Sequence, residues 1–426
     1  MKKIILGCIL LGNISILLAQ DFYLHCGAIL NVETGKIQKE QTIIVSGNKI
    51  KQVRSGFINP DLVSDKVINL KDATILPGLI DLHVHIESET NPKKYLARFT
   101  DNDADVAFQS VVYAERTLMA GFTTVRDLGG TGVNISLRKA IEKGLVKGPR
   151  IFTSGKAIAT TGGHADPTNG SRKELMGNPG PYEGVVNSPE EARKAVRQRY
   201  KDGSDVIKIT ATGGVLSVAK NGSNPQFTLE EIKAITSTAN DYGMLTAAHA
   251  HGDEGMKRAI IGGIKTIEHG TFMSDETMEL MKKYNTYLVP TITAGKYVAD
   301  KAEVTGFYPD VVAVKAKEVG PQIQGTFARA YKKGVPIAFG TDAGVFPHGQ
   351  NAKEFGYMAE AGMPIIEALQ SATLTNASLL GMSDKLGKLK SNYLADIIAV
   401  KDNPLKNVKT LEDVIFIMKN GEIYKK

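Results

Sequence analysis

The middle of the chain alternates short apolar strand patterns with amphipathic helical patterns, and this alternation limits the fold more than any other feature. Buried-strand patterns recur eight times in residues 76–380, among them "LPGLIDLHVH", "DVIKITAT", "MLTAAHAH" and "PIAFGTDAG". Helical patterns such as "TLEEIKAITSTANDYG" lie between them, and Thr228 followed by Glu231 is typical of a capping box at a helix start. Eight strands alternating with helices predict an α/β fold, a parallel (β/α)8 TIM barrel. The alternative is an open doubly wound sheet. The sequence contains no Gly-x-Gly-x-x-Gly turn after a predicted strand, so a dinucleotide-binding site is not supported.

Both ends of the chain differ from the middle, because they alternate apolar and polar residues with a period of two. "QTIIVSGNKIKQV" near the start and "VIFIMKNGEIYKK" at the end are typical of antiparallel strands. Within the second segment, Asn420 and Gly421 are typical of a hairpin turn. Neither end is long enough for a stable sheet alone. We therefore expect residues 21–75 and 381–426 to form one small β-sandwich beside a barrel of residues 76–380.

The first 20 residues, "MKKIILGCILLGNISILLAQ", resemble a secretory signal peptide. Two lysines precede an apolar segment, and the sequence then becomes polar. As a membrane anchor the segment is short, and a glycine, an asparagine and a serine interrupt it. We therefore expect cleavage near residue 20 and a periplasmic or secreted protein with no stable membrane insertion.

Charge and cysteine content restrict the partners and the source of stability. The net charge is +7, from 52 lysines and arginines against 45 acids, and no basic run is interleaved with aromatic residues. A nucleic-acid partner is therefore not expected. Removal of the leader takes away Cys8 and leaves Cys26 alone, so the exported chain has no internal disulfide and depends on its core. The sequence leaves open whether the protein forms a homo-oligomer.

Several predicted barrel strands end in a side chain that binds metals or transfers protons. The first ends in two histidines one residue apart, and residues i and i+2 of a strand share a face. The complete set is His83, His85, Lys208, His249, His251, His269 and Asp342. Barrel active sites form at the carboxyl ends of the strands, so these side chains are expected to converge. Five of the eight histidines belong to this set, and imidazole with carboxylate suits Zn²⁺ or another borderline divalent cation.

Lys208 leaves two interpretations open. It is either a buried lysine paired with a neighbouring acid such as Asp205, or an amine that has reacted with CO₂ to form an anionic carbamate. An unmodified ammonium group cannot bind a dication, whereas a carbamate can bridge two metals. Carbamate formation needs a desolvated amine with a lowered pKa.

These motifs resemble those of the amidohydrolase superfamily. "LPGLIDLHVH", the later "IEHGT" and the "GTDAG" segment carry the resemblance, which covers essentially the whole processed chain. Within that superfamily, "TTGGHAD", "IKITATGGVLS" and "AAHAHG" are most similar to the prolidase-like and imidazolonepropionase-like branch. That branch includes dipeptidases that cleave before Pro, Arg or Lys and amidases that resemble carboxypeptidases.

The resemblance implies a site with two divalent metal ions, zinc being the first candidate. His83 and His85 would bind the more buried ion, with Asp342 nearby. His249 and His269 would bind the more exposed ion. Lys208, as N6-carboxylysine, would bridge the two.

The resemblance also implies a mechanism, in which a hydroxide that bridges the metals attacks an amide carbonyl and Asp342 acts as general acid and base. The expected protein is an exported amidohydrolase that cleaves a dipeptide or an N-acyl amino acid. A cyclic-amide hydrolase similar to imidazolonepropionase and a lactonase are the alternatives. A scaffold without activity is disfavoured, because every expected ligand position is filled.

The residues that contact the substrate are less well defined. His251 is expected to contact the substrate or support a ligand, with metal ligation as the alternative. His164, in a glycine-rich loop, would polarise the scissile carbonyl or hold a substrate carboxylate. Arg126 either binds that carboxylate as a planar fork or pairs with Asp127 or another acid. Lys220, in the loop after the Lys208 strand, is expected to be solvated, with contact to a carboxylate as the alternative.

Overall fold

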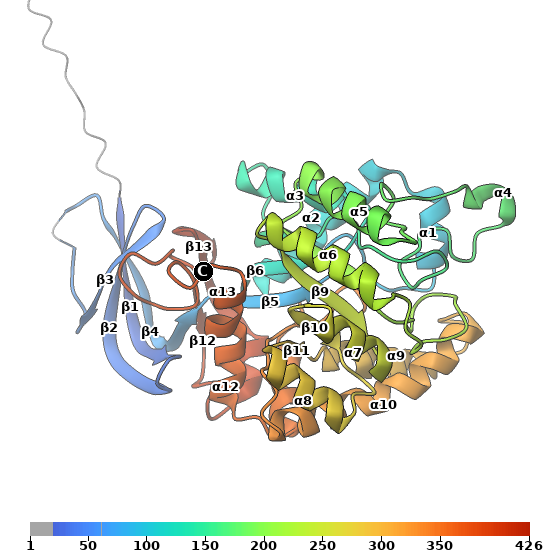
Figure 1. Ribbon diagram of the computed structural model, residues 1–426. Helices are drawn as coiled ribbons and strands as arrows, with labels where there is room; N and C mark the ends of the chain where they lie inside the picture. Colours follow the sequence, from blue (N-terminus) through green and yellow to red (C-terminus); the bar gives the residue numbers. More distant parts are fainter. Residues whose placement is uncertain (1–19, 61) are drawn as a thin grey trace, which may run out of the picture.

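The structure is a computed structural model that describes residues 20–60 and 62–426. The predicted leader, with Cys8, lies outside the described residues. The described chain has an α/β fold, with a barrel in the middle of the sequence and a sheet made from both ends (Figure 1).

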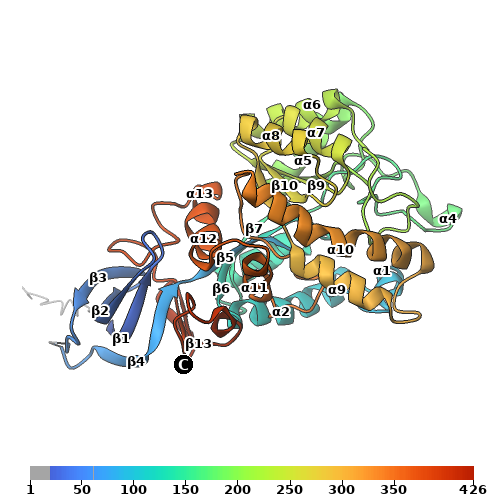
Figure 2. The same ribbon diagram turned by 90° about the horizontal axis from the view of Figure 1, so that it is seen from below.

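Strands from the two ends of the chain form one seven-stranded sheet beside the barrel (Figure 2). Its order is β14-β13-β12-β4-β1-β2-β3. The strands are β1 (Asp21–Asn31), β2 (Lys36–Ser46), β3 (Lys49–Ser55), β4 (Lys66–Pro77), β12 (Ile397–Val400), β13 (Val414–Lys419) and β14 (Glu422–Lys425). Strand β4 joins the two ends, because it pairs in parallel with β1 and antiparallel with β12. The two ends thus share a single hydrogen-bonded sheet, as expected of a small domain built from both ends of the chain.

The sheet buries an apolar core to which both ends contribute. The core includes Leu24, Cys26, Ile43, Ile397 and Phe416. The predicted hairpin between β13 and β14 is confirmed, since Asn420 and Gly421 both adopt positive φ angles of 53° and 77°. The alternating pattern at the ends of the chain therefore reports strands with one buried face.

Parallel strands in the middle of the chain form the barrel. One group is β5 (Leu79–Val84), β6 (Phe122–Asp127) and β7 (Arg150–Thr153), in that order. The other group is β8 (Val206–Thr210), β9 (Leu245–Ala250), β10 (Thr266–His269) and β11 (Tyr287–Val289), also neighbours in sequence order.

Two short segments close these groups into a ring. Residues after β7 reach β8, where the backbone N–H of Ile158 donates to the carbonyl oxygen of Lys208 at 2.8 Å. Residues 336–339 fill the remaining position. The Leu288 N–H donates to Pro336 O at 2.8 Å on one side, and the Leu82 N–H donates to Phe339 O at 3.0 Å on the other. The ring of parallel segments is the predicted TIM barrel.

Helices surround the barrel strands (Figures 1 and 2). They are α1 (Lys94–Thr100), α2 (Asp103–Met119), α3 (Val133–Glu142), α4 (Lys173–Met176), α5 (Pro189–Asp202), α6 (Leu229–Asp241), α7 (Asp253–Ile261), α8 (Asp275–Tyr284), α9 (Ile292–Ala302), α10 (Asp310–Lys332), α11 (Lys353–Glu360), α12 (Ile365–Gln370) and α13 (Asn376–Leu379). The predicted capping box starts α6: the Thr228 N–H donates to the Glu231 carboxylate at 2.8 Å, and the Thr228 hydroxyl accepts from the Glu231 N–H. Across residues 20–60 and 62–426, no helix is both long enough and apolar enough to span a bilayer.

The chain passes from the sheet into the barrel at Gly78, between β4 and β5. A Cβ atom at this position would lie 2.2 Å from the hydroxyl of Thr123, so only glycine fits there without displacing its neighbour. The Gly78 N–H donates to the carbonyl of Asp396 at 2.8 Å, next to β12. This close crossing fixes β5, and with it the first two histidines of the site, against the terminal sheet.

Candidate active site

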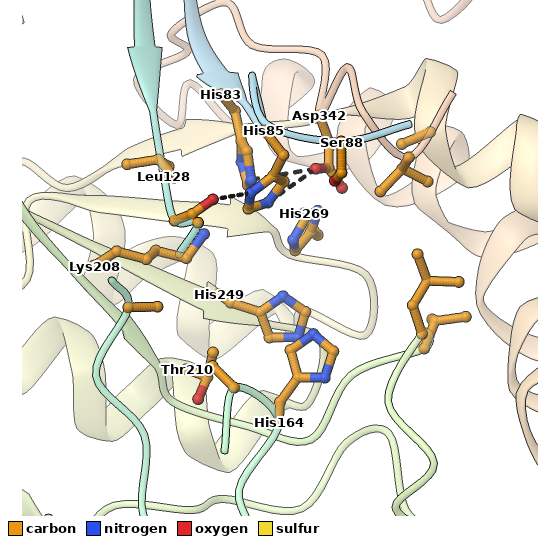
Figure 3. Close-up of a pocket in the computed structure, with 18 of the residues that line it drawn as sticks. His83, His85, Ser88, Leu128, His164, Lys208, Thr210, His249, His269 and Asp342 are labelled. Atoms are coloured by element: carbon orange, nitrogen blue, oxygen red, sulfur yellow. Dashed lines mark hydrogen bonds and ion pairs between the residues drawn. The ribbon is translucent and has the colours of Figure 1, made fainter. Parts of the chain in front are cut away.

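A cavity of about 610 Å³ lies at the carboxyl ends of the barrel strands. Figure 3 shows side chains from separate strands pointing into it. The predicted residues that line it are His83, His85, His164, Lys208, His249, His251, His269 and Asp342. The expected convergence of strand-end side chains is therefore present in the fold.

His83, His85 and Asp342 form the first group of candidate ligands. The Asp342 Oδ1 atom lies 3.5 Å from His83 Nε2 and 3.4 Å from His85 Nε2. Both Asp342 Oδ1 and His83 Nε2 are buried and have no hydrogen-bond partner among the described residues. Buried polar atoms are rarely left without partners, so atoms that converge in this way fit a bound cation.

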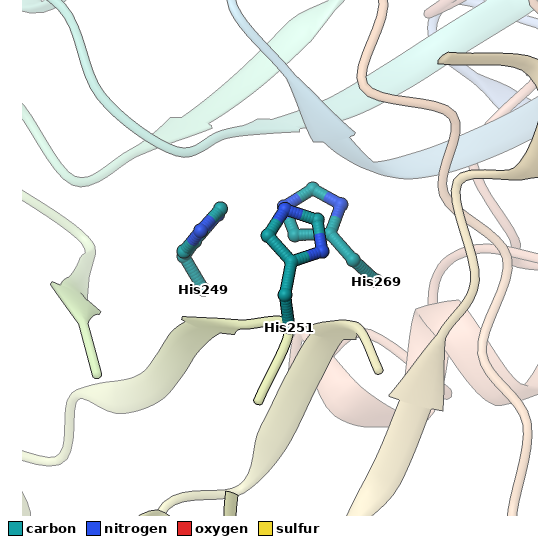
Figure 4. A group of neighbouring side chains, drawn as sticks. All are labelled: His249, His251 and His269. Atoms are coloured by element: carbon teal, nitrogen blue, oxygen red, sulfur yellow. The ribbon is translucent and has the colours of Figure 1, made fainter. Parts of the chain in front are cut away.

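His249, His251 and His269 form the second group (Figure 4). One ring nitrogen from each of them lies within 4.8 Å of the others. His269 also belongs to a triad with His83 and Asp342 by the same criterion, so it lies between the two groups. This geometry is compatible with both predicted roles of His251, as a metal ligand or as a substrate contact.

One ring nitrogen of each candidate histidine ligand contacts a protein acceptor. The pairs are His83 Nδ1 with Glu268 at 2.8 Å, His85 Nδ1 with Gly129 O at 2.8 Å, His249 Nε2 with Gly213 O at 3.0 Å, His251 Nδ1 with the Thr271 hydroxyl at 2.8 Å and His269 Nδ1 with the Thr291 hydroxyl at 2.7 Å. Such partners fix the tautomer and the ring orientation of metal-binding histidines. The other nitrogen of each ring is thereby left for a ligand in the cavity.

Glu268 is a supporting residue that the sequence analysis did not identify. Its carboxylate lies between His83 and Arg126, whose Nη2 donates to it at 2.9 Å. Arg126 is fully buried and also donates to the Leu82 carbonyl. It does not line the cavity. The role of Arg126 as substrate contact is therefore corrected: this arginine pairs with an acid, as in the other interpretation, and that acid is Glu268.

Lys208 extends from β8 into the cavity, toward His83 and His85 (Figure 3). It is 3% exposed, and burial lowers its pKa to about 8, against the opposing influence of Glu268 and Asp342. The alternative partner, Asp205, instead forms an ion pair with Arg138 and accepts from the Thr153 N–H. Lys208 thus has the desolvated amine that carbamate formation needs.

Burial also sets the protonation of the candidate ligand groups. It lowers the pKa of His85, His164 and His251 to about 3, and it lowers the pKa of His83, His249 and His269 well below the usual value. Burial raises the pKa of Asp342 to about 7, although the charges of Lys208 and Lys94 oppose this shift. At neutral pH the imidazoles are therefore neutral, which is the form that binds metals.

The backbone at this edge of the barrel is strained. His269, Thr291 and Asp342 have positive φ angles of 72°, 54° and 62°. This region is unfavourable for residues with a Cβ atom, and such conformations concentrate at functional sites. Here the turn after each strand directs a ligand, or the hydroxyl that orients one, toward the cavity.

His164 approaches the second ligand group from the loop after β7. Its ring stacks on His249 with a centroid separation of 4.4 Å, and its Nδ1 atom is buried without a hydrogen-bond partner among the described residues. A Cβ atom on Gly214 would lie 2.3 Å from the His164 ring, so glycine is required beneath it. The sequence placed His164 in a glycine-rich loop but gave no sign of this packing.

The rest of the cavity wall has an apolar side and a charged rim. Val215, Leu216, Ala294, Val298, Val319 and Ile323 line the apolar side, from the loop after β8 and from α9 and α10. Lys94, Asp103, Lys156 and Glu183 contribute charged groups. Lys220 is exposed and does not line the cavity, in agreement with the solvated position expected for it.

Comparison with known proteins agrees with this geometry. The profile of the Amidohydrolase family matches residues 74–425. The chain is 32% identical to ochratoxinase of Aspergillus niger over 375 residues, which cover 82% of this chain and 75% of that protein.

Solved structures give the same result. A structure described as a Xaa-Pro dipeptidase with bound methionine in the active site has a TM-score of 0.92 and 52% sequence identity, and the match covers 96% of this chain and all of that one. A prolidase complexed with N-methylphosphonate-L-proline has a TM-score of 0.86 and 30% identity, and the match covers 96% of this chain and 100% of that one. The donor set, the barrel and these similarities agree: the chain belongs to the amidohydrolase family, in its prolidase-like branch, and is a hydrolytic enzyme of the class that acts on amide bonds.

Proposed function

We propose that this protein is an exported binuclear metal-dependent peptidase that hydrolyses the amide bond of a dipeptide or an N-acyl amino acid. The main support is the two groups of candidate ligands that line the cavity. In the first group, buried atoms of His83 and Asp342 have no hydrogen-bond partner among the described residues. Structures similar to this chain contain methionine or a proline phosphonate, which makes an amino-acid derivative the first substrate class to test.

Two cations would be held by six side chains. His83 and His85 would bind one ion with Asp342, His249 and His269 would bind the other, and carboxylated Lys208 would connect them. His251 is kept as a substrate contact, with ligation as the alternative. When bound, the cations would supply an activated water and polarise the scissile carbonyl.

Asp342 is the proposed general acid and base. Its carboxylate lies beside His83 and His85, and burial raises its pKa to about 7. A group with a pKa near the working pH both accepts and releases a proton efficiently, although a bound cation would lower this value. Asp342 would therefore take a proton from the attacking water and deliver it to the leaving amine.

His164 and His251 are the proposed polar contacts for the substrate. The neutral ring of His164 would donate to the oxygen that develops charge at the scissile carbonyl. His251 lies next to His249 and would meet the free carboxylate of the substrate. The apolar side of the cavity would hold an apolar side chain of the substrate, since burying such a group is worth about 1.5–3 kcal/mol.

The test is hydrolysis by the zinc-loaded protein of a dipeptide library, with N-acyl amino acids, an imidazolone and simple lactones as parallel substrates. We expect about two equivalents of metal per chain and preference for the peptide-like amides. Preference for the cyclic amide with one equivalent of metal would favour the imidazolonepropionase-like alternative. Preference for lactones would favour the ester-cleaving alternative.

Export rests on the leader-like sequence alone. Expression of the full chain in a bacterium, followed by fractionation and mass spectrometry, should give a mature protein that begins near Gln20. A membrane-bound form that retains Met1 would contradict this part of the proposal.

A further inference from the structure

Lys315, in α10, is a buried cation that the proposed chemistry does not use. It is 4% exposed, and its ammonium group donates three hydrogen bonds to one loop. The acceptors are the carbonyl oxygens of Gly214 at 2.8 Å, Ser217 at 2.6 Å and Ala219 at 2.8 Å. A lysine ammonium has three donors, so all of them are used on this loop.

Lys315 is unusual because its buried ammonium group has no acidic side chain as a partner among the described residues. Among the described residues it forms no ion pair, and burial lowers its pKa to about 8. Burying an ammonium group is unfavourable unless hydrogen bonds compensate, and a methionine would fill the same space without that cost. What a lysine adds at this position is the attachment of the loop to the helix.

The attached loop and the helix form facing parts of the apolar wall. The loop brings Val215 and Leu216 to the cavity, and α10 brings Val319 and Ile323. Residues four apart share one face of a helix, so Val319 lies on the same face as Lys315. A second bond holds the loop from α1, since the Tyr95 hydroxyl donates to Leu216 O at 2.9 Å.

The same loop also borders the polar part of the site. Gly214, the first acceptor of Lys315, lies directly beneath the His164 ring. Gly213 accepts from His249 Nε2 at 3.0 Å. A displacement of the loop would therefore alter the apolar wall and the support of His164 together.

We propose that Lys315 is a positioning residue that sets the preference of the site for substrates with a large apolar side chain, by holding residues 213–220 against α10. The preference rests on the proposed function, whereas the attachment of the loop does not. Without the lysine, the loop moves away from α10 and the apolar wall no longer encloses the side chain of the substrate.

Lys315→Met, compared with Lys317→Met, tests both parts. Lys317 lies on the same helix, is about half exposed and pairs with Glu303, so its replacement controls for loss of a lysine. We expect Lys315→Met to lower kcat/KM about 10-fold for a dipeptide with a large apolar side chain, mainly through KM, and to lower it by a clearly smaller factor for the glycine counterpart, whose loss would come only through the support of His164. Lys315→Arg should restore part of the preference, and metal content should stay unchanged. An equal fall for both substrates would overturn the proposed preference.

Two readouts do not need turnover. Amide hydrogen exchange of residues 213–220 should become faster in Lys315→Met and stay the same in Lys317→Met. Binding of free methionine should weaken more than binding of glycine.

If the wild type cleaves no amide but these results hold, the proposed function fails and the attachment of the loop by Lys315 stands. Unchanged exchange refutes the attachment. Should Lys315→Met not fold, Tyr95→Phe removes the second bond to the loop and should shift exchange and binding in the same direction by a smaller factor.

Discussion

The terminal sheet and the mouth of the barrel, at the carboxyl ends of its strands, differ in whether their buried polar atoms have hydrogen-bond partners. In the sheet, buried apolar side chains such as Leu24 and Phe416 form the core, and His25 bonds to the carbonyl of Ile58 at 2.8 Å. At the mouth, His83 Nε2 and Asp342 Oδ1 are buried without partners among the described residues, and two candidate ligands, His269 and Asp342, have positive φ angles.

This difference indicates that the residues that stabilise the fold and the residues proposed to carry out the reaction lie in different regions. Packing of apolar groups lowers the free energy of the folded state, whereas strained backbone and unsatisfied polar atoms raise it. The two regions meet at Gly78, where β4 of the sheet continues into β5 of the barrel. We therefore expect substitutions at the mouth to change metal content or turnover, and substitutions in the sheet to change the free energy of unfolding.

Asp342→Asn should have the largest effect on turnover. Asparagine keeps the size of the side chain but cannot shuttle a proton, so we expect a fall in kcat of about 10³-fold. Metal content by mass spectrometry and the midpoint of thermal unfolding should change little. Asp384→Asn, at an exposed position, is the matched control and should behave as the wild type. Turnover within a factor of two of the wild type would exclude Asp342 as the proton carrier.

Lys208→Ala should have the next largest effect, because it removes the proposed bridge between the cations. Metal content should fall below one equivalent, and bicarbonate with short carboxylates should restore part of the activity. Lys220→Ala removes a solvated lysine and should leave both quantities unchanged. Full metal loading of the Lys208 variant would show that no carbamate bridges the ions.

Glu268→Gln should have a smaller effect, since it acts through His83. Glutamine removes the negative charge that orients the His83 ring and neutralises Arg126. We expect metal affinity to fall about 10-fold, as for other partners of metal-binding histidines. Glu279→Gln, at an exposed site that pairs with a lysine of its own helix, is the control. Unchanged metal affinity would mean that Glu268 has no part in orienting His83.

The convergence of the candidate ligands on one cavity was predictable, because strand patterns and strand ends are local features of the sequence. Two histidines after an apolar run must share a face and must lie at the carboxyl edge of a parallel barrel. The same reasoning placed Lys208 and Asp342 at this cavity, where the structure has them. Local patterns were also sufficient for the Thr228 capping box and the hairpin at Gly421.

The supporting contacts were not predictable, because each depends on residues far apart in the chain. Arg126 meets Glu268 across 142 positions, and Lys315 meets Gly214 across 101. In the sequence, Arg126 resembles a substrate anchor at a strand end and Lys315 resembles an ordinary helix-surface lysine. Only the closed barrel shows that one lies behind the site and that the other joins two parts of its wall.

Phe416→Ala should have the smallest effect on turnover and provides the opposite test of the comparison. Phe416 is fully buried in the terminal sheet, and its loss should destabilise the protein by about 3–5 kcal/mol. Cys26, in the same core, is the reporter: burial raises its pKa to about 12, so a thiol reagent should label it only after the sheet opens. In a Cys8→Ser background, Phe416→Ala should label faster while keeping its metal content and kcat. If kcat fell in parallel with faster labelling, the ligand positions would depend on the terminal sheet, and the separation between a packing region and a chemical region would not hold.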